Sequence, residues 1–333
     1  MTWNNRKIFI TGADGFIGSH LAEFLAEQGA EVTALALYNS FDSHGWLDTL
    51  PAKTRDALKL VRGDVRDPHQ MNTLCKGQDV VFHLAALIGI PYSYEAPSSY
   101  VATNVQGTVN VLTAARDAGV SKIVHTSTSE VYGTAQFTPI TEEHPLQGQS
   151  PYSASKTSAD MMAEAFARSF DLPVVTLRPF NTYGPRQSER AVISTILRQV
   201  YDDACTEIRL GDLLPSRDFC FVADTVNAFL SVAELGASSF GQAYNAGTGK
   251  GVTIGALVEI IKDVTGCSNP VTQEETRIRP PESEVMELLA DAQKLQDASG
   301  WVAKTDLKNG IKITADWWRE RIESVRPDAG YIT

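Results

Sequence analysis

Three glycines at the end of the first predicted strand constrain this chain more than any other feature. An apolar run at residues 7–11 leads into Gly12, Gly15 and Gly18, and a helix is expected from there to residue 28. Glycine permits a tight turn and lets backbone N–H groups approach a pyrophosphate at the positive end of a helix. The spacing G-x-x-G-x-x-G is one residue longer than the common dinucleotide fingerprint, and a glycine triplet alone also fits a plain turn. The flanking strand and helix favour a dinucleotide loop.

The first half of the chain alternates β-branched strands with amphipathic helices, which predicts a parallel α/β sheet. The expected strands are 7–11, 31–37, 58–62, 80–84, 122–127 and 173–178, and the expected helices are 18–28, 67–75, 98–118, 151–169 and 192–201. After residue 178 the alternation breaks at a predicted loop, 181–186. We expect the chain to return to the sheet at 219–235 and 242–246 before it enters a C-terminal part closed by Trp317 and Trp318.

This pattern predicts an α/β fold with a doubly wound Rossmann sheet and a smaller C-terminal α/β substrate lobe. The Rossmann domain would comprise residues 1–178 and 218–247, and the lobe residues 179–217 and 248–333. A ligand is expected in the cleft between the two parts.

Composition excludes several classes of protein. The chain has 333 residues, 43% of them hydrophobic, and a formal net charge of -11, which argues against a nucleic-acid partner. No signal peptide is expected, because polar residues lead directly into the first strand, and no apolar run approaches the roughly 18 residues of a membrane span. The four cysteines lie far apart without metal-ligand spacing. They favour reduced thiols in a cytoplasm over disulfides or a metal site.

The end of the second strand bears on the choice of dinucleotide. NAD sites usually carry an acidic residue there, whereas this chain reads Tyr38-Asn39-Ser40. These residues could hydrogen-bond ribose or be ordinary turn residues. No lysine or arginine lies between Lys7 and Lys53, so a 2′-phosphate would find little positive charge, and the pattern favours NAD over NADP. Asp64, after the third strand, fits either an adenine contact or a surface turn.

A hydroxyl-rich run, Thr126-Ser127-Thr128-Ser129-Glu130, ends a strand, and Tyr152 and Lys156 follow on a predicted helix. Residues four apart on a helix share a face. The lysine ammonium would favour tyrosinate, so that Tyr152 could accept a hydroxyl proton near neutral pH. Taken alone, the pair also fits an exposed tyrosine and lysine. Glu130 adds a carboxylate able to remove a proton made acidic by a new ketone.

Seven motifs in order resemble the extended short-chain dehydrogenase/reductases of the nucleotide-sugar epimerase/dehydratase group, over nearly the whole chain. They are the glycine loop, His83-Leu84-Ala85-Ala86, Asn104-Val105-x-Gly107-Thr108, the run at 126–130, Tyr152-x-x-x-Lys156, Asn181-x-Tyr183-Gly184-Pro185 and Arg217-Asp218-Phe219. The resemblance implies an NAD-dependent enzyme that binds a nucleotide-diphosphate sugar. It also implies a homodimer paired through the helices 98–118 and 151–169.

The resemblance assigns roles to individual residues. Thr128, Ser129, Glu130, Tyr152 and Lys156 would be catalytic, with Thr128 on the sugar oxygen that is oxidised. The implied cofactor contacts are Gly12, Gly15, Phe16, Ile17, Gly18, Tyr38, Asn39, Ser40, Asp64, Val65, Leu84, Ala85, Ala86, Asn104, Tyr152 and Lys156. The implied substrate contacts are Ser93, Tyr94, Asn181, Arg186, Arg217 and Arg279.

Glu130 separates the activities within this group. Related 4-epimerases usually lack a glutamate at this position, whereas 4,6-dehydratases carry Asp-Glu or Ser-Glu after the threonine, as this chain does with Ser129-Glu130. The stretches 87–94, 147–150 and 279–285 are similar to dehydratases of the legionaminic-acid type, whose substrate would be a UDP- or GDP-linked N-acetylglucosamine. UDP-glucuronate decarboxylases also carry Ser-Glu, and Arg186, Arg277 or Arg279 could then bind the sugar carboxylate. A 4-epimerase and a regulatory nucleotide-binding protein would fit the remaining motifs as well.

Overall fold

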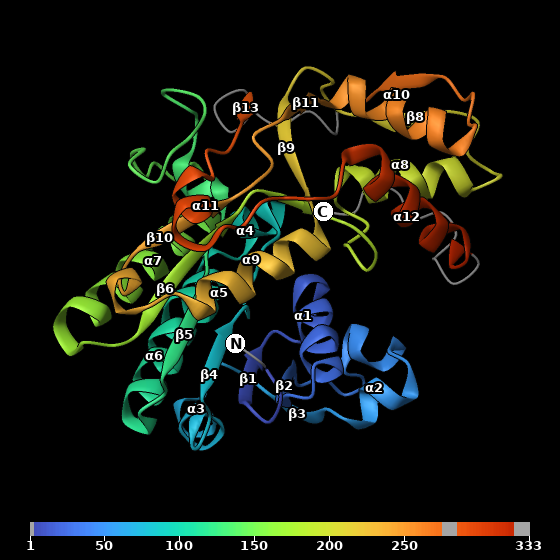
Figure 1. Cartoon of the computed structure of the whole chain (residues 1–333). Helices are drawn as coiled ribbons and strands as arrows, with labels where there is room; N and C mark the ends of the chain where they lie inside the picture. Colours follow the sequence, from blue (N-terminus) through green and yellow to red (C-terminus); the bar gives the residue numbers. More distant parts are fainter. Residues whose placement is uncertain (1–2, 275–284, 323–333) are drawn as a thin grey trace.

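A seven-stranded parallel sheet forms the centre of the computed structural model, which describes residues 3–274 and 285–322 (Figure 1). The strand order is β10-β6-β5-β4-β1-β2-β3, and every neighbouring pair is parallel. The strands are β1 (Lys7–Thr11), β2 (Glu31–Leu37), β3 (Lys59–Gly63), β4 (Val80–His83), β5 (Lys122–Thr126), β6 (Val174–Pro179) and β10 (Ala243–Ala246). The sequence predicts each of them to within two residues, because strands buried on both faces read as short apolar runs.

Helices cover both faces of this sheet, which confirms the predicted doubly wound Rossmann fold. One face packs against α1 (Phe16–Glu27), α9 (Val222–Glu234) and α11 (Gln293–Ser299). The other packs against α3 (Pro68–Cys75), α6 (Gly107–Ala118) and α7 (Pro151–Phe170). The carboxyl ends of β1 and β4 meet where the strand order reverses, which is the position where open α/β sheets bind ligands.

The helix predicted over 98–118 is not continuous. It consists of α5 (Pro97–Tyr100), a π-helical segment η2 (Val101–Gln106) and α6. Asn104 in the π segment is fully buried, and its side chain hydrogen-bonds the backbone N–H and carbonyl of Leu87 and the hydroxyl of Ser155. π turns recur at functional sites. Here the π turn places the Asn104 side-chain amide between Leu87, after β4, and Ser155 on α7.

A second, smaller group of elements packs beside the carboxyl end of the sheet, in the upper part of Figure 1. Its strands β7 (Asn181–Tyr183), β9 (Ser216–Phe221), β11 (Gly251–Thr253) and β13 (Glu287–Leu288) form one sheet, and β8 (Ile208–Leu210) pairs with β12 (Val271–Gln273). The helices α8 (Val192–Tyr201), α10 (Ile254–Thr265) and α12 (Leu307–Arg319) surround a core that contains Trp318. We call this group the small lobe.

Two expectations about this region hold only in part. Residues 181–186 do not form a loop throughout, because Asn181–Tyr183 is the strand β7. Residues 219–235 do not rejoin the main sheet as a strand: β9 belongs to the small lobe, where Phe219 and Phe221 pack against Tyr183, and only the helix α9 returns to cover the main sheet.

Contacts between α1 and the loop after β7 join the two parts. The His20 ring contacts the Pro185 carbonyl at 2.9 Å, and Arg186 forms an ion pair with Glu23 at 2.7 Å. Leu295 and Trp301 pack in the core under the main sheet although they follow the small-lobe strands in sequence. The residue boundaries of the two predicted domains stay a prediction.

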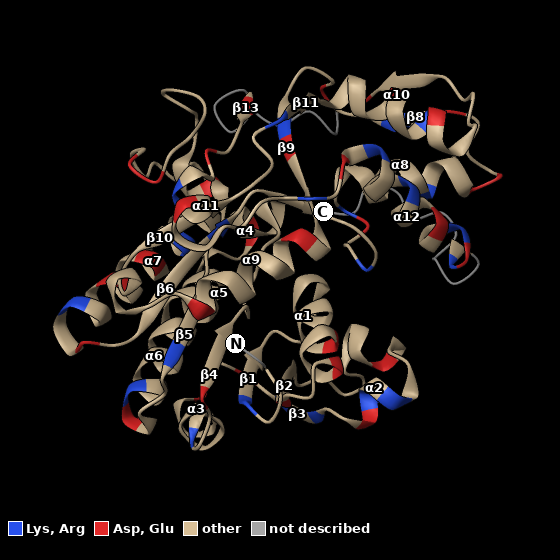
Figure 2. Ribbon diagram, in the orientation of Figure 1, with Lys and Arg blue, Asp and Glu red and all other residues tan. Residues whose placement is uncertain are grey.

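The remaining elements are short connections: η1 (Gly45–Thr49), α2 (Ala52–Asp56), α4 (Ile90–Glu95), η3 (Ser129–Tyr132) and η4 (Ala237–Ser239). Acidic and basic residues are interspersed over the helices and loops of both parts (Figure 2). Throughout residues 3–274 and 285–322, none of the helices is long and apolar enough to cross a membrane.

Candidate active site

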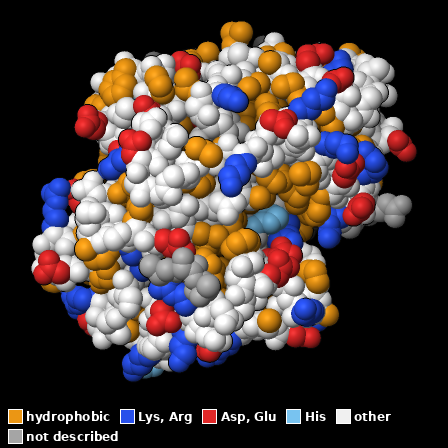
Figure 3. Space-filling model, viewed as in Figure 1, with side chains coloured by type: hydrophobic (Ala, Val, Ile, Leu, Met, Phe, Trp, Pro, Cys, Tyr) orange, Lys and Arg blue, Asp and Glu red, His pale blue; other side chains and the backbone are white. Residues whose placement is uncertain are grey.

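A cavity of about 820 Å³ lies at the carboxyl ends of β1, β4 and β5 and extends to the first residues of the small lobe. The glycine loop, the segment 84–92 after β4, the run 126–130 and residues 179–182 all line it. On the face in Figure 3, hydrophobic side chains and a histidine are exposed where the two parts of the molecule meet. The cavity thus occupies the predicted cleft.

The glycine loop lies close against the segment after β4. Gly12 has a φ of +67°, and a Cβ there would lie 2.7 Å from the Ala85 nitrogen. A Cβ on Gly18 would lie 2.1 Å from the Gly12 carbonyl oxygen. The Thr11 hydroxyl accepts hydrogen bonds from the N–H groups of Leu84 and Ala85, at 3.2 and 3.1 Å. These bonds hold the end of β1 against the segment that follows β4.

The start of α1 fits the pyrophosphate of a dinucleotide. Gly15 is the residue before the helix, and it provides no side-chain cap for the first-turn N–H groups. Phe16, Ile17 and Gly18 line the cavity. Unsatisfied amides at the positive end of a helix are donors for a phosphate.

The five predicted catalytic residues line the same cavity. Ser129 and Glu130 belong to the turn η3 after β5, and Thr128 caps this turn. Tyr152 and Lys156 come from the first turns of α7. The Thr128 hydroxyl accepts the Glu130 N–H at 3.3 Å, and the Thr128 side chain also hydrogen-bonds Tyr152. The Glu130 carboxylate is close enough to act electrostatically on Tyr152. The arrangement places a hydroxyl, a phenol and a carboxylate around one space.

The protonation of the Tyr152 and Lys156 pair differs from the sequence-based expectation. Burial raises the pKa of Tyr152, and the nearby Glu130 charge acts in the same direction. Burial lowers the pKa of Lys156 to about 8, and its amino group donates to the Thr126 carbonyl at 2.6 Å. The net effect on the Tyr152 pKa is thus opposite in direction to the expected lowering, and the role of Lys156 in favouring tyrosinate stays a prediction.

A buried polar network underlies this pair. Asp160, one turn after Lys156, contacts the His125 ring at 3.2 Å, accepts the Ser127 hydroxyl at 2.7 Å and pairs with Arg178 at 3.0 Å. Burial opposes the charge of Asp160, but the hydrogen bond to His125 and the cations Arg178 and Lys156 hold its pKa below the ordinary value. Arg178 also donates to the Tyr132 hydroxyl at 3.0 Å, so the network reaches the turn that carries Glu130.

Most of the predicted cofactor residues line the cavity, and four do not. Tyr38 lines a neighbouring cavity, Ser40 is exposed, and the Asn39 side chain closes its own loop by bonding Leu37 and Ser43. Asn104 lies behind the cavity wall and supports Leu87. The predicted cofactor residues that line the cavity are Gly12, Gly15, Phe16, Ile17, Gly18, Asp64, Val65, Leu84, Ala85, Ala86, Tyr152 and Lys156.

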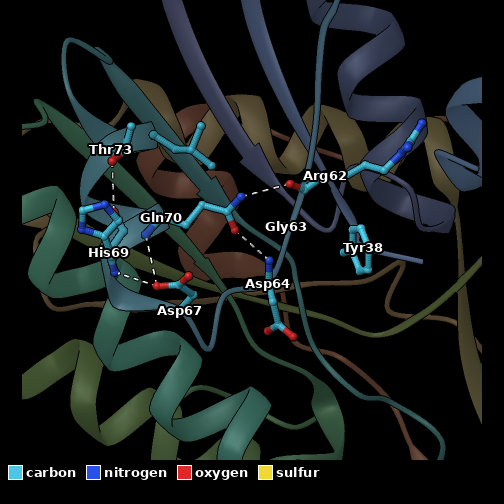
Figure 4. Close-up of a pocket in the computed structure, with 9 residues that line it drawn as sticks. Tyr38, Arg62, Gly63, Asp64, Asp67, His69, Gln70 and Thr73 are labelled. Atoms are coloured by element: carbon cyan, nitrogen blue, oxygen red, sulfur yellow. Dashed lines mark hydrogen bonds between the residues drawn. The ribbon is translucent and has the colours of Figure 1, made fainter. Parts of the chain in front are cut away.

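The neighbouring cavity, of about 550 Å³, lies between the ends of β2 and β3 and the start of α3 (Figure 4). Gln70 crosses it, accepting the Asp64 N–H at 3.0 Å and donating to the Arg62 carbonyl at 3.0 Å. Asp64 borders both cavities. A hydrogen bond from Arg66 holds the pKa of Asp64 below its usual value, so this carboxylate is already paired.

The predicted substrate residues are dispersed. Asn181 lines the cavity, whereas the Ser93 hydroxyl is buried and donates to the Ile90 carbonyl, and Tyr94 is exposed. Arg186 is paired with Glu23, and Arg217 is a buried residue of β9 that donates to the Ser216 carbonyl at 3.0 Å. Arg279 and Arg277 lie outside the described residues.

The structure adds cavity residues that sequence reasoning missed. Gln187 and Arg190 line the cavity, and an Arg190 Nη1 atom lies 3.0 Å from where a Cβ of Gly89 would be. Within the described part of the chain, Asn181 Oδ1, Gln187 Oε1 and Thr126 Oγ1 are buried without a hydrogen-bond partner. A buried polar atom without a partner is costly, so these acceptors are suited to donors on a ligand. In the sequence, only the position of Gln187 and Arg190 shortly after the motif at 181–185 could have indicated these two residues.

Across the described ranges, no group of three or more His, Cys, Asp or Glu side chains could hold a metal ion. The glycine loop, the helix terminus and the Tyr-Lys pair instead define an NAD-dependent enzyme of the extended short-chain dehydrogenase/reductase class.

Comparison with known proteins specifies the family. The family model described as GDP-mannose 4,6 dehydratase matches residues 9–314. A UDP-glucose 4-epimerase of Mycolicibacterium smegmatis is 32% identical over 322 residues, covering 95% of this chain and 99% of that protein. A dTDP-glucose 4,6-dehydratase of Streptomyces antibioticus is also 32% identical over 322 residues, covering 94% and 92%. The solved dTDP-glucose 4,6-dehydratase DesIV of Streptomyces venezuelae, with NAD bound, has a TM-score of 0.85 and 29% identity, covering 95% and 98%.

The chain therefore belongs to the nucleotide-sugar dehydratase/epimerase family, and it is an enzyme of that NAD-dependent superfamily. NAD is the cofactor that the comparisons support.

Replacing Asp160 with Asn should lower the free energy of unfolding by about 3–5 kcal/mol, because it leaves Arg178 and Lys156 buried without a counter-charge. Chemical denaturation measures this change. Asp117→Asn is the matched control, since Asp117 pairs with Arg116 on the exposed end of α6 and its loss should cost about 0.5 kcal/mol or less. Equal effects of the two substitutions would contradict the importance of the buried network.

Proposed function

We propose that this protein is a nucleotide-sugar 4,6-dehydratase. The observation that carries the proposal is Glu130, a carboxylate that lines the same cavity as Thr128 and Tyr152. Oxidation, rotation and reduction of a sugar require no such group, whereas elimination of water requires a base for the proton beside the new ketone.

In the proposed reaction, Thr128 positions the hydroxyl at C4 of the sugar and Tyr152 takes its proton. When bound, NAD would supply the hydride acceptor that allows C4 to become a ketone and the hydride that reduces C6. Glu130 removes the proton from C5, and the C6 hydroxyl leaves as water with a proton from Glu130 or through Ser129. As C6 is reduced, C5 regains a proton in exchange for the one that Tyr152 took from the C4 hydroxyl. The net change is loss of one water, and the cofactor would be regenerated.

The proposed substrate is a UDP- or GDP-linked hexose, with N-acetylglucosamine as the sugar and the legionaminic-acid type of dehydratase as the nearest subgroup. Asn181 Oδ1 and Gln187 Oε1 support a polar substrate, because each is a buried acceptor without a partner among the described residues. Arg190 adds a guanidinium at the cavity wall, suited to phosphate oxygens. Ser93, Tyr94, Arg186, Arg217 and Arg279 stay as proposals from the sequence.

A 4-epimerase is the competing enzyme activity, because the relatives include proteins named UDP-glucose 4-epimerase as well as proteins named 4,6-dehydratase. A UDP-glucuronate decarboxylase, with Arg186, Arg277 or Arg279 binding the sugar carboxylate, and a regulatory nucleotide-binding protein are the remaining alternatives from the sequence. Product mass after incubation with UDP- and GDP-sugars separates all four. Loss of water supports the dehydratase, loss of carbon dioxide the decarboxylase, an unchanged mass with altered stereochemistry the epimerase, and no turnover the regulatory protein.

Glu130→Gln should lower the rate of water loss at least about 100-fold, because proton transfer by a positioned side chain contributes at least that factor. The affinity for NAD should stay within about twofold, because the change is isosteric and lies away from the glycine loop. Mass spectrometry follows the product, and calorimetry follows NAD binding.

Glu143→Gln is the control for this substitution, since Glu143 is an exposed carboxylate on the segment that follows η3. If Glu130→Gln still released water at the parent rate, Glu130 would not be the base.

Arg190→Ala should weaken the binding of UDP or GDP about tenfold, because charge-assisted hydrogen bonds to a diphosphate are lost. Arg186→Ala is the matched comparison, since that guanidinium is paired with Glu23. Titration calorimetry with each nucleotide measures both variants. A larger loss in Arg186→Ala would favour the assignment made from sequence and contradict the one for Arg190.

We further propose a cytoplasmic homodimer. Val101, Met161, Met162 and Phe170 are exposed apolar side chains on the η2 and α7 segments, and apolar surface of this kind favours association. The four cysteines are free thiols, which suits a reducing compartment. Analytical ultracentrifugation should give twice the mass of the chain, and Met161→Lys should give a monomer. A monomeric parent protein would contradict the dimer.

A further inference from the structure

The glycine loop brings a carboxylate to the end of β2, where the sequence has none. Asp14 stands between Gly12 and Gly15, and its Oδ2 atom accepts the N–H of Leu37, the last residue of β2, at 3.0 Å. Asp14 and Leu37 both line the main cavity. The glycine loop after the neighbouring strand β1 therefore brings this side chain to the place where NAD sites usually have an acidic residue at the end of the second strand.

The loop after β2 holds Asp14 in this position. The Trp46 N–H donates to the Asp14 carbonyl at 3.0 Å, and a Cβ on Gly45, which has a φ of +58°, would lie 2.6 Å from that oxygen. Residues 45 and 46 are thus folded over the glycine loop. Burial raises the pKa of Asp14, because the carboxylate has lost part of its water, and hydroxyl donors from a ligand would replace that water.

The nearby guanidinium groups are already paired with other acids. Arg62 on β3 pairs with Asp42, and Arg66 pairs with Asp64. In Figure 4 the Arg62 side chain extends away from Gln70 and Asp64. A phosphate at the end of β2 would lie beside the Asp14 carboxylate. To bind Arg62 or Arg66, it would have to compete with the aspartates that already pair with them.

We propose that Asp14 is the residue that selects NAD over NADP. Its Oδ2 atom is held by Leu37, and its Oδ1 atom is the one that accepts a hydroxyl of the adenine ribose. A 2′-phosphate on that ribose would lose this hydrogen bond and be repelled by the carboxylate. The assignment concerns the cofactor alone and is independent of whether the enzyme eliminates water or epimerises its substrate.

Asp14→Asn tests this proposal with little disturbance of the loop. The amide oxygen can still accept the Leu37 N–H, whereas the charge is removed. Calorimetry on the purified enzyme gives the dissociation constants for NAD and NADP, and thermal unfolding reports whether the loop still folds. We expect NAD to bind about tenfold more weakly, because a hydrogen bond to a charged group is lost. The ratio of the NADP constant to the NAD constant should fall at least about tenfold as the repulsion disappears.

Glu31→Gln is the control, because Glu31 is exposed at the opposite end of β2 and its loss changes net charge equally. In Glu31→Gln, the ratio of the NADP dissociation constant to the NAD dissociation constant should equal that of the parent enzyme. An unchanged ratio in Asp14→Asn, including an equal loss of affinity for both dinucleotides, would overturn the proposal and leave Asp14 as a turn residue.

A second measurement uses the unaltered enzyme and stands if Asp14→Asn does not fold. NAD that lacks the 2′-hydroxyl of the adenine ribose and NAD that lacks the 3′-hydroxyl are titrated beside NAD itself. At least one of the two analogues should bind about tenfold more weakly. Equal affinity for all three compounds would overturn the proposal.

Discussion

Arg178 links the helix α7, which carries Tyr152 and Lys156, to the turn η3, which carries Glu130. Its Nε atom donates to Asp160 on α7 at 3.1 Å, and its Nη1 atom donates to the Tyr132 hydroxyl in η3 at 3.0 Å. Asp160 lies one helical turn beyond Lys156, and Tyr132 lies two residues beyond Glu130. Since the charges are buried and mutually hydrogen-bonded, the spacing between the Tyr-Lys helix and the carboxylate turn is set by the interior of the protein and not by a surface loop.

The elements that could be predicted from sequence are those whose pattern depends on burial. The seven parallel strands read as apolar runs, and the glycine loop is defined by a strand before it and a helix after it. The π segment at 101–106 could not be predicted, because a helix with one wide turn has nearly the same periodicity as a regular one. The strand β7 was missed because its pairing with β9 joins residues far apart in the sequence.

The direction of a charged side chain was the least predictable feature. Arg186 and Arg190 lie in one loop, yet Arg186 has a positive φ of 69° and pairs with Glu23 on α1, while Arg190 borders the cavity. Asp14 was overlooked for a related reason. The usual position of a ribose carboxylate in the sequence is the end of β2, whereas here the glycine loop after β1 brings one to that place.

The electrostatic environment of Tyr152 bears on the proposed distinction between dehydratases and epimerases. Burial raises the pKa of Tyr152 and the Glu130 charge acts in the same direction, so the phenolate that the proposed reaction requires forms against both effects. A carboxylate added to this site therefore opposes the base that starts the reaction. Thr128 offsets part of this cost, because its hydroxyl bonds both the Glu130 backbone and the Tyr152 side chain. An epimerase, which abstracts no carbon-bound proton, has no reason to accept such a penalty, and this is the physical argument for Glu130 as the residue that separates the two activities.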